Sequence, residues 1–258
     1  MILTLDLGNT NLFLGVFKDD KLIATYRTYS DKKKSSDGYK EIINAFLNQS
    51  GLNKKEFKGA ILSSVIPSLS KDIIYAVEKL LGVHCYLVSQ KVKSGLSIKI
   101  DNPSELGADL VCDSVGANYR YGYPSIIIDL GTATKYLVID KNGAFVGCVI
   151  HSGIKLSFDS LARNAAQLME IDYDAPKNII GKNSRDSLNS GAIYGTIAQI
   201  KELTNMIEKE IGYPLKRIVT GGNANLIKGM LDESFIFDDN LILDGLLAIY
   251  KHNLSHLK

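Results

Sequence analysis

The chain has 258 residues, 45% of them hydrophobic, and a formal net charge of +2. This balance favours neither a nucleic-acid-binding protein nor an acidic tail, and no apolar run approaches the roughly 18 residues of a membrane helix. The N-terminus lacks the basic region of a secretory signal, and the three cysteines are widely spaced in apolar stretches. We therefore expect a cytoplasmic protein with buried, reduced thiols. The four scattered histidines form no zinc motif.

The first half of the chain alternates between strand and helix patterns. In chain order the pattern predicts strands over residues 2–6 and 12–17, a hairpin turn over 18–21, a polar loop over 30–38, a helix from Tyr39 to Leu47, a strand over 59–65 and a helix near 69–81. Such alternation predicts an α/β fold.

The opening pattern recurs in the second half. A shift of 123 positions lays Asp6-Leu7-Gly8 on Asp129-Leu130-Gly131, Leu14 on Leu137, Val16 on Ile139 and the turn Asp19-Asp20 on Asn142-Gly143. A repeat of this length predicts two related α/β domains, over residues 1–118 and 119–258. Substrates commonly bind between two such domains, so we expect a cleft there.

Each copy carries the residues of a phosphate-binding turn. In Asp6-Leu7-Gly8-Asn9-Thr10 an acid ends a buried strand, a glycine permits close approach, and small polar residues donate hydrogen bonds. The carboxylate of Asp6 would hold a hydrated Mg²⁺. A third element, Thr220-Gly221-Gly222, follows a strand and provides the flat backbone that an adenosine pocket requires.

These three elements, in this order, resemble the actin, hexokinase and heat-shock-protein superfamily of ATPases, whose two ribonuclease-H-like domains face each other across a cleft. The chain further resembles the type III pantothenate kinases. The motifs that carry this resemblance are Asp6-Leu7-Gly8-Asn9-Thr10-Asn11, Asn102-Pro103-Ser104-Glu105-Leu106-Gly107-Ala108-Asp109, Asp129-Leu130-Gly131-Thr132-Ala133-Thr134, Gly181-Lys182-Asn183-Ser184, Ser190-Gly191-Ala192-Ile193-Tyr194-Gly195, Thr220-Gly221-Gly222 and the closing helix Leu241–Tyr250.

The resemblance implies ATP-dependent phosphorylation of pantothenate to 4′-phosphopantothenate, the first step of coenzyme A biosynthesis. It implies that Asp109 is the general base, that Asp6 binds Mg²⁺ and that Asp129 binds K⁺ or NH₄⁺. ATP contacts are implied for Asp6, Gly8, Asn9, Thr10, Asn11, Gly131, Thr132, Thr134, Gly221 and Gly222, and pantothenate contacts for Ile100, Gly107, Ala108 and Ser184. Ser184 would reach the substrate of a neighbouring subunit, which implies a homodimer with active sites at its interface.

Asp109 also has a purely structural interpretation, as the N-cap of a helix that continues with Leu110-Val111-Cys112.

Four positions depart from the family pattern. Leu110 replaces an arginine, Ile100 a tyrosine and Ser184 a threonine, while Lys135 follows Thr134 in place of a small polar residue. Lys135 either points to solvent, replaces the monovalent cation, or supplies the charge lost at Leu110.

Two alternatives follow from these departures. One is a paralogous kinase with another small hydroxylated acceptor, and the other is a catalytically silent nucleotide-binding regulator. The retained carboxylates Asp6, Asp109 and Asp129 argue against the regulator, which needs no base.

Overall fold

The computed structural model describes residues 1–89, 92–164 and 176–255. Contacts within it divide the chain into two compact units. The first unit joins Met1–Arg120 to the segment that begins at Leu241, and the second is Tyr121–Asn240. In the described part of the chain, no helix combines the length and the hydropathy that a membrane span requires.

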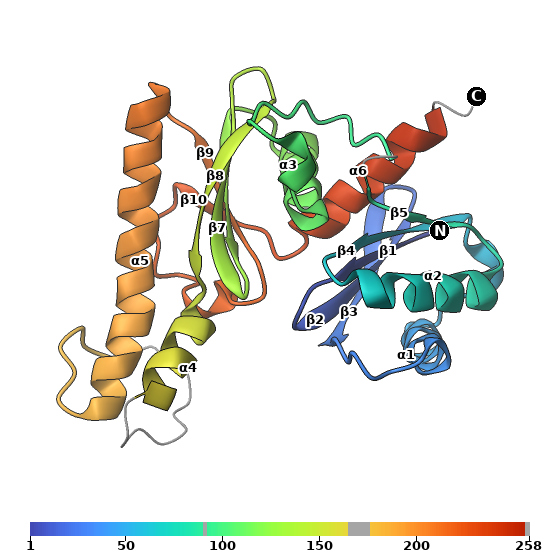
Figure 1. Ribbon diagram of the computed structural model, residues 1–258, viewed down its shortest axis with the longest axis horizontal. Helices are drawn as coiled ribbons and strands as arrows, with labels where there is room; N and C mark the ends of the chain where they lie inside the picture. The colour runs from blue at the N-terminus through green and yellow to red at the C-terminus, as the bar shows by residue number, and fades with distance from the viewer. Residues whose placement is uncertain (90–91, 165–175, 256–258) are drawn as a thin grey trace. The chain divides into compact units, whose positions relative to one another are not determined.

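The first unit is built on a five-stranded mixed sheet in the order β3-β2-β1-β4-β5 (Figure 1). Its strands are β1 (Ile2–Leu7), β2 (Asn11–Lys18), β3 (Lys21–Tyr29), β4 (Gly59–Ser64) and β5 (Cys85–Leu87). Its helices are α1 (Ser36–Gln49), α2 (Pro67–Leu81), α3 (Ala108–Arg120) and α6 (Leu241–Ser255), with 3-10 turns at Lys54–Glu56 and Pro103–Glu105. β1 pairs antiparallel with β2 and parallel with β4, so it lies at the centre of the sheet.

Helices cover both faces of this sheet. Leu3 and Leu5 of β1 are fully buried in one core with Ile43 of α1, while Phe13 and Phe17 of β2 pack in a second core with residues of α3 and α6. Because successive side chains of a strand point to opposite faces, the continuous apolar run of β2 supplies both cores.

α6 packs against α3 and against the sheet of the first unit. The predicted domain 119–258 includes α6, whereas the structure places α6 in the first unit. Leu243, Leu246 and Leu247 are buried in the core that contains Val115 of α3, so the chain returns to its first unit after Asn240.

The second unit contains another five-stranded sheet, in the order β10-β9-β6-β7-β8. Its strands are β6 (Ser125–Leu130), β7 (Ala133–Ile139), β8 (Phe145–Ser152), β9 (Lys216–Thr220) and β10 (Phe235–Phe237), and its helices are α4 (Ile154–Asn164) and α5 (Ser184–Ile211), with a 3-10 turn at Ala224–Leu226. Ile193 and Ile197 of α5 are buried against Ile126 and Ile128 of β6. The predicted α/β class with two units is confirmed.

Both units repeat the same strand–turn–strand topology, but the turn between β6 and β7 is one residue shorter than the turn between β1 and β2. Leu7 pairs with Leu12, whereas Leu130 pairs with Thr134. Beyond this turn, the predicted match of Leu14 with Leu137 is therefore wrong. Leu14, opposite Leu5, corresponds to Tyr136, opposite Ile128, and both are fully buried in the core of their own unit. A slip of one residue would turn these side chains to the other face of the sheet.

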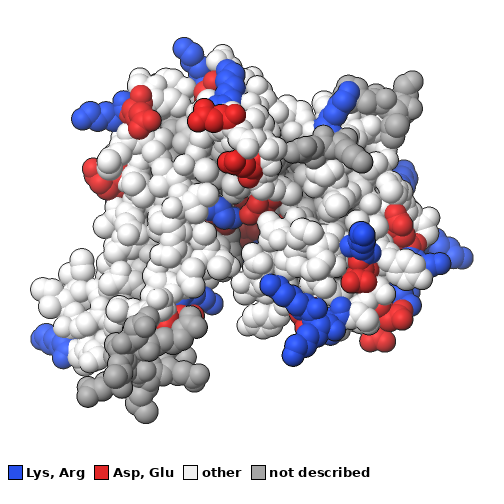
Figure 2. All heavy atoms as spheres, in the orientation of Figure 1, with Lys and Arg blue, Asp and Glu red and all other residues white. Residues whose placement is uncertain are grey.

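The cysteines are free thiols, and the prediction that all are buried is wrong for Cys148. Cys85 and Cys112 are buried, but Cys148 is exposed because it lies on β8, at the edge of its sheet. Its apolar neighbours Val149 and Ile150 are exposed as well. Figure 2 shows lysines and arginines interspersed with acidic side chains on the face in view.

Candidate active site

The first predicted phosphate-binding turn, at the end of β1, is held by hydrogen bonds to its own backbone groups. The amide of Gly8 donates to the carbonyl of Asn11 at 2.9 Å. Ser30 follows β3 and donates two hydrogen bonds to this turn. Its hydroxyl donates to the carbonyl of Gly8 at 2.7 Å, and its amide donates to the carbonyl of Thr10 at 2.9 Å. The turn is therefore preorganised, with the side chains of Asn9 and Thr10 exposed at its tip.

Asp109 lies in the first turn of α3, which begins at Ala108. The helix thus starts before Asp109, and its carboxylate is half-buried beside Gly107. A Cβ atom at Gly107 would lie 2.6 Å from Oδ1 of Asp109, so any other residue at position 107 would require this carboxylate to shift. A carboxylate here also interacts favourably with the positive end of the helix dipole.

Several carboxylates of the first unit lie near the thiol of Cys112. Burial raises the pKa of Cys112 well above its ordinary value, and the carboxylates of Asp6, Asp113 and Asp109 raise it further. Asp6 and Asp109 therefore lie within electrostatic reach of the same sulfur atom. The structure brings the predicted Mg²⁺ ligand and the predicted base to one region.

Asp113 is a buried carboxylate that sequence reasoning missed. It follows Asp109 by one helical turn and so lies on the same side of α3, where two like charges are unfavourable unless other groups compensate them. The i, i+4 spacing of the two acids after Gly107-Ala108 is the sequence signal that could have identified it.

The second predicted phosphate-binding turn, between β6 and β7, accepts hydrogen bonds from two later segments of the chain. The amide of Gly131 donates to the carbonyl of Ala133 at 3.1 Å, and the amide of Gly153 donates to Thr132 at 3.0 Å. Nδ2 of Asn223 donates to the carbonyl of Gly131 at 2.9 Å. Asn223, which directly follows the double glycine, was not predicted to have a role.

Thr132 and Thr134 differ in exposure within this turn. The side chain of Thr132 is exposed, while Thr134 is fully buried and its hydroxyl has no hydrogen-bond partner among the described residues. Of these two predicted ATP contacts, Thr132 is therefore the one whose side chain is exposed.

Asp129 forms an ion pair with Lys135. These residues lie directly opposite each other on β6 and β7, and Nζ of Lys135 is 2.7 Å from Oδ2 of Asp129. The pair is largely buried, since the lysine side chain is 16% exposed and the aspartate side chain 12%. Of the interpretations of Lys135, orientation into solvent is therefore excluded.

The double glycine lies against this aspartate. Gly221 has a φ of +97°, which side chains rarely adopt, and a Cβ atom there would lie 2.6 Å from the amide nitrogen of Leu130. The amide of Asn223 donates to the carbonyl of Leu130 at 2.9 Å. The structure thus brings Gly221 and Gly222 next to the second predicted phosphate-binding turn.

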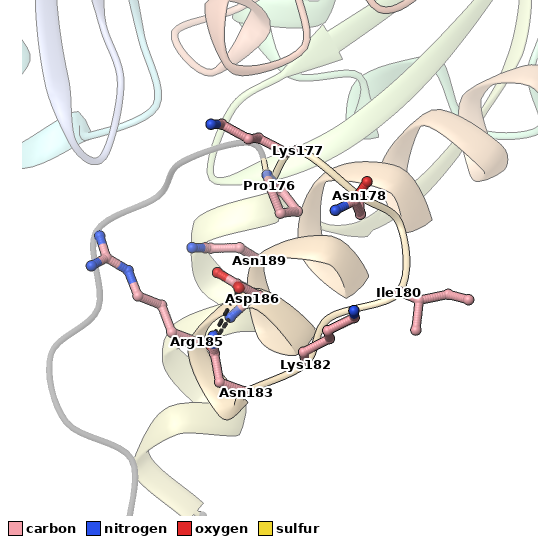
Figure 3. A pocket seen from close by; sticks show the side chains of 9 residues that line it. All are labelled: Pro176, Lys177, Asn178, Ile180, Lys182, Asn183, Arg185, Asp186 and Asn189. Carbon is pink, nitrogen blue, oxygen red and sulfur yellow. Dashed lines mark hydrogen bonds between the residues drawn. The ribbon is translucent and has the colours of Figure 1, made fainter.

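A basic pocket of about 570 Å³ lies at the start of α5, and Figure 3 shows the side chains that line it. Asn183 caps the helix, because its Oδ1 accepts a hydrogen bond from the amide of Asp186 at 2.8 Å. Lys177, Lys182 and Arg185 contribute positive charge. Ser184, the first residue of α5, is exposed beside them.

The remaining predicted pantothenate contacts lie in the first unit. Ala108 begins α3, and Ile100 is half-buried in the preceding segment. Leu110, at the position of the family arginine, is only 8% exposed. This position therefore carries a packed side chain rather than a charged group that could reach a ligand.

The family of the chain follows from its sequence. A family model described as type III pantothenate kinase matches residues 2–206. The chain belongs to the type III pantothenate kinase family. A type III pantothenate kinase of Halalkalibacterium halodurans is 35% identical over 254 residues, covering 98% of this chain and all of that protein. One from Agathobacter rectalis is 34% identical over 252 residues, covering 97% of each chain.

A solved structure supports the fold of this pantothenate kinase family member. MreB5 of Spiroplasma citri, determined with bound ADP, aligns with a TM-score of 0.52 at 12% identity and covers 99% of this chain and 98% of its own. At this identity the likeness concerns the fold alone, which is that of the actin-like ATPases and sugar kinases.

Proposed function

We propose that this chain transfers the γ-phosphoryl group of ATP to the primary hydroxyl of pantothenate, which forms 4′-phosphopantothenate in the first step of coenzyme A biosynthesis. The observation that carries this proposal is the family membership together with the position of Asp109 at the start of α3, in the same unit as the Asp6 turn. Phosphoryl transfer requires mainly positioning and charge neutralisation, so a preorganised turn and one suitably placed carboxylate are central to it.

In this proposal Asp109 accepts the proton of the pantothenate hydroxyl as its oxygen attacks the γ-phosphorus. The carboxylate is half-buried, and Gly107 keeps the space beside it open. A general base must lie within hydrogen-bond reach of the proton that it removes. The position of Asp109 next to the proposed pantothenate contacts Gly107 and Ala108 supports this role.

Asp6 is the proposed Mg²⁺ ligand. The described residues contain no group of three or more histidine, cysteine or acidic side chains that could enclose a metal. This fits Mg²⁺, which is usually bound by one or two carboxylates together with substrate phosphates and water. When bound, Mg²⁺ neutralises charge on the phosphates. Asn9, Thr10 and Asn11 from the first turn, and Gly131 and Thr132 from the second, are the proposed phosphate contacts.

A monovalent cation at Asp129 fits the residues poorly. The carboxylate of Asp129 already forms an ion pair with the ammonium group of Lys135, whose Nζ lies 2.7 Å from Oδ2. A second cation about 4 Å from that ammonium would be repelled by about 4 kcal/mol at an effective dielectric constant of about 20.

The basic pocket of α5 is the proposed contact surface for the carboxylate of pantothenate, with Ser184 beside it. Because the family resemblance implies that this serine reaches the site of a neighbouring subunit, we propose a homodimer. Lys177, Lys182 and Arg185 provide the opposite charge for an acidic substrate.

A second candidate function, phosphorylation of another small hydroxylated compound, is favoured by Leu110 and Ile100. Both are apolar where the family has an arginine and a tyrosine, so polar contacts to pantothenate are lost.

A panel of hydroxy acids and sugars assayed with magnesium-ATP separates the two functions. We expect kcat/KM to be highest for pantothenate. A different acceptor with a tenfold higher value would establish the second function.

A further inference from the structure

The pair of Lys135 and Asp129 belongs to the second unit alone. The residue opposite the corresponding Asp6 on β2 is Phe13, and the guanidinium carbon of Arg27 lies 4.0 Å from the centre of its ring. The two copies of the repeat thus share an aspartate at the end of the first strand and differ in the residue opposite it. Only the second copy places a lysine there.

Lys135 has little freedom to leave this position. It lies within β7, which pairs with β6 on one side and with β8 on the other, and its side chain is 16% exposed. The direct register of Asp129 with Lys135 brings the two side chains to the same face of the sheet.

Glycines enclose the other side of the carboxylate. A Cβ atom at Gly131 would lie 3.6 Å from Oδ1 of Asp129, and a Cβ atom at Gly221 would lie still closer to the same oxygen. Asp129 itself is 9% exposed. Its two oxygens therefore face the ammonium of Lys135 and the glycine backbone.

We propose that the ammonium group of Lys135 stands in the place where the family binds K⁺ or NH₄⁺, so that this chain needs no added monovalent cation. An alkylammonium carries the same unit charge as these ions, and it donates hydrogen bonds to oxygen acceptors as NH₄⁺ does. Because it is tethered to β7, its occupancy does not depend on the salt concentration. The part of the proposal that concerns catalysis rests on the proposed kinase function, whereas the part that concerns cation binding does not.

The first test is a binding measurement that needs no activity. Thallous nitrate is titrated into the protein and followed by ²⁰⁵Tl NMR, since Tl⁺ occupies K⁺ sites. We expect no saturable site in the wild type and one site in Lys135→Thr. Lys141→Thr, which removes an exposed lysine shortly after β7, should bind no Tl⁺. Saturable Tl⁺ binding to the wild type would overturn the proposal.

The second test measures pantothenate phosphorylation in choline chloride, KCl and NH₄Cl at constant ionic strength. We expect wild-type rates to agree within twofold, and Lys135→Thr to be at least tenfold slower in choline chloride than in KCl. A tenfold stimulation of the wild type by KCl, or a variant with wild-type rates in every salt, would contradict the proposal.

If Lys135→Thr does not fold, Lys135→Met, which keeps a long side chain without the charge, replaces it in both tests. A protein that shows no kinase activity in any salt but behaves as expected towards Tl⁺ would refute the proposed function and leave the cation inference intact.

Discussion

Gly245 of α6 lies directly against the backbone carbonyl of Cys112 in α3. Gly116 of α3 makes the reciprocal approach to the carbonyl of Leu241. The two glycines allow the helices to cross in backbone contact, and this contact attaches the end of the chain to the unit that contains Asp109. The position of the proposed base thus depends on residues more than a hundred positions away along the chain.

We therefore predict that Gly245→Ala destabilises the protein. The added methyl group has no space, and overpacking of this kind typically costs about 1–3 kcal/mol. Gly191→Ala on α5 is the matched control, because outside its own helical turn no atom of the described residues lies within 4 Å of its added Cβ. It should stabilise the helix by about 0.5–1 kcal/mol. Urea unfolding of both variants checks the pair, and equal stabilities would refute the packing argument.

Asp109→Asn should lower kcat by about 10²–10⁴-fold, the usual contribution of a general base. The affinity of this variant for ATP should equal that of the wild type, since Asp109 is not among the proposed ATP contacts. Asp101→Asn, an exposed acid before α3, serves as the control and should keep wild-type activity. Steady-state kinetics with separate ATP-binding measurements distinguishes loss of chemistry from loss of binding. A parallel loss of ATP binding in Asp109→Asn would assign the residue a structural role.

The pair of Arg217 and Glu208 should make stability depend on acid pH. Nη2 of Arg217 lies 2.7 Å from Oε2 of Glu208 and Nε lies 3.1 Å from Oε1, and these contacts lower the pKa of Glu208 below its ordinary value of 4.5. A lowered pKa stabilises the fold above 4.5, and this contribution is lost as the pH falls through the folded-state pKa. The Tm difference between wild type and Glu208→Gln should therefore shrink below pH 4.5. A constant difference down to pH 3 would contradict this.

Thiol labelling should distinguish the three cysteines. Cys148 is exposed, although partial burial raises its pKa as well. Cys85 and Cys112 are buried, which raises the pKa of Cys85 to about 12 and that of Cys112 well above its usual range. Since the thiolate is the reacting species, Ellman's reagent should modify one thiol quickly in the native protein and three after unfolding. Cys148→Ser should abolish the fast phase. Fast labelling that persists in this variant would show that a buried thiol becomes accessible.

The sequence was sufficient to predict the α/β class, the repeat and the turns around Asp6 and Asp129, because these depend on local patterns. It could not define the pairing register beyond each turn. Residues 12–17 are apolar almost throughout, so no alternation distinguishes the two faces, and the shorter second turn went undetected. The direct pairing of Lys135 with Asp129 follows from that turn.

Two other features depended on long-range packing. The apolar residues of α6 indicate a buried helix but do not identify its partner, and α3 lies more than a hundred residues earlier. Cys148 stands between apolar residues and was expected to be buried, yet its position on an edge strand exposes it. Which strand forms the edge is decided by the whole sheet and not by the strand itself.

The central claim is that this chain phosphorylates pantothenate through Asp109. The most direct test incubates the purified protein with magnesium-ATP and pantothenate and detects 4′-phosphopantothenate by mass spectrometry, with Asp109→Asn in parallel. We predict product from the wild type and at least a hundredfold less from the variant. No product from a wild-type protein that binds ATP, or equal product from both proteins, would contradict the claim.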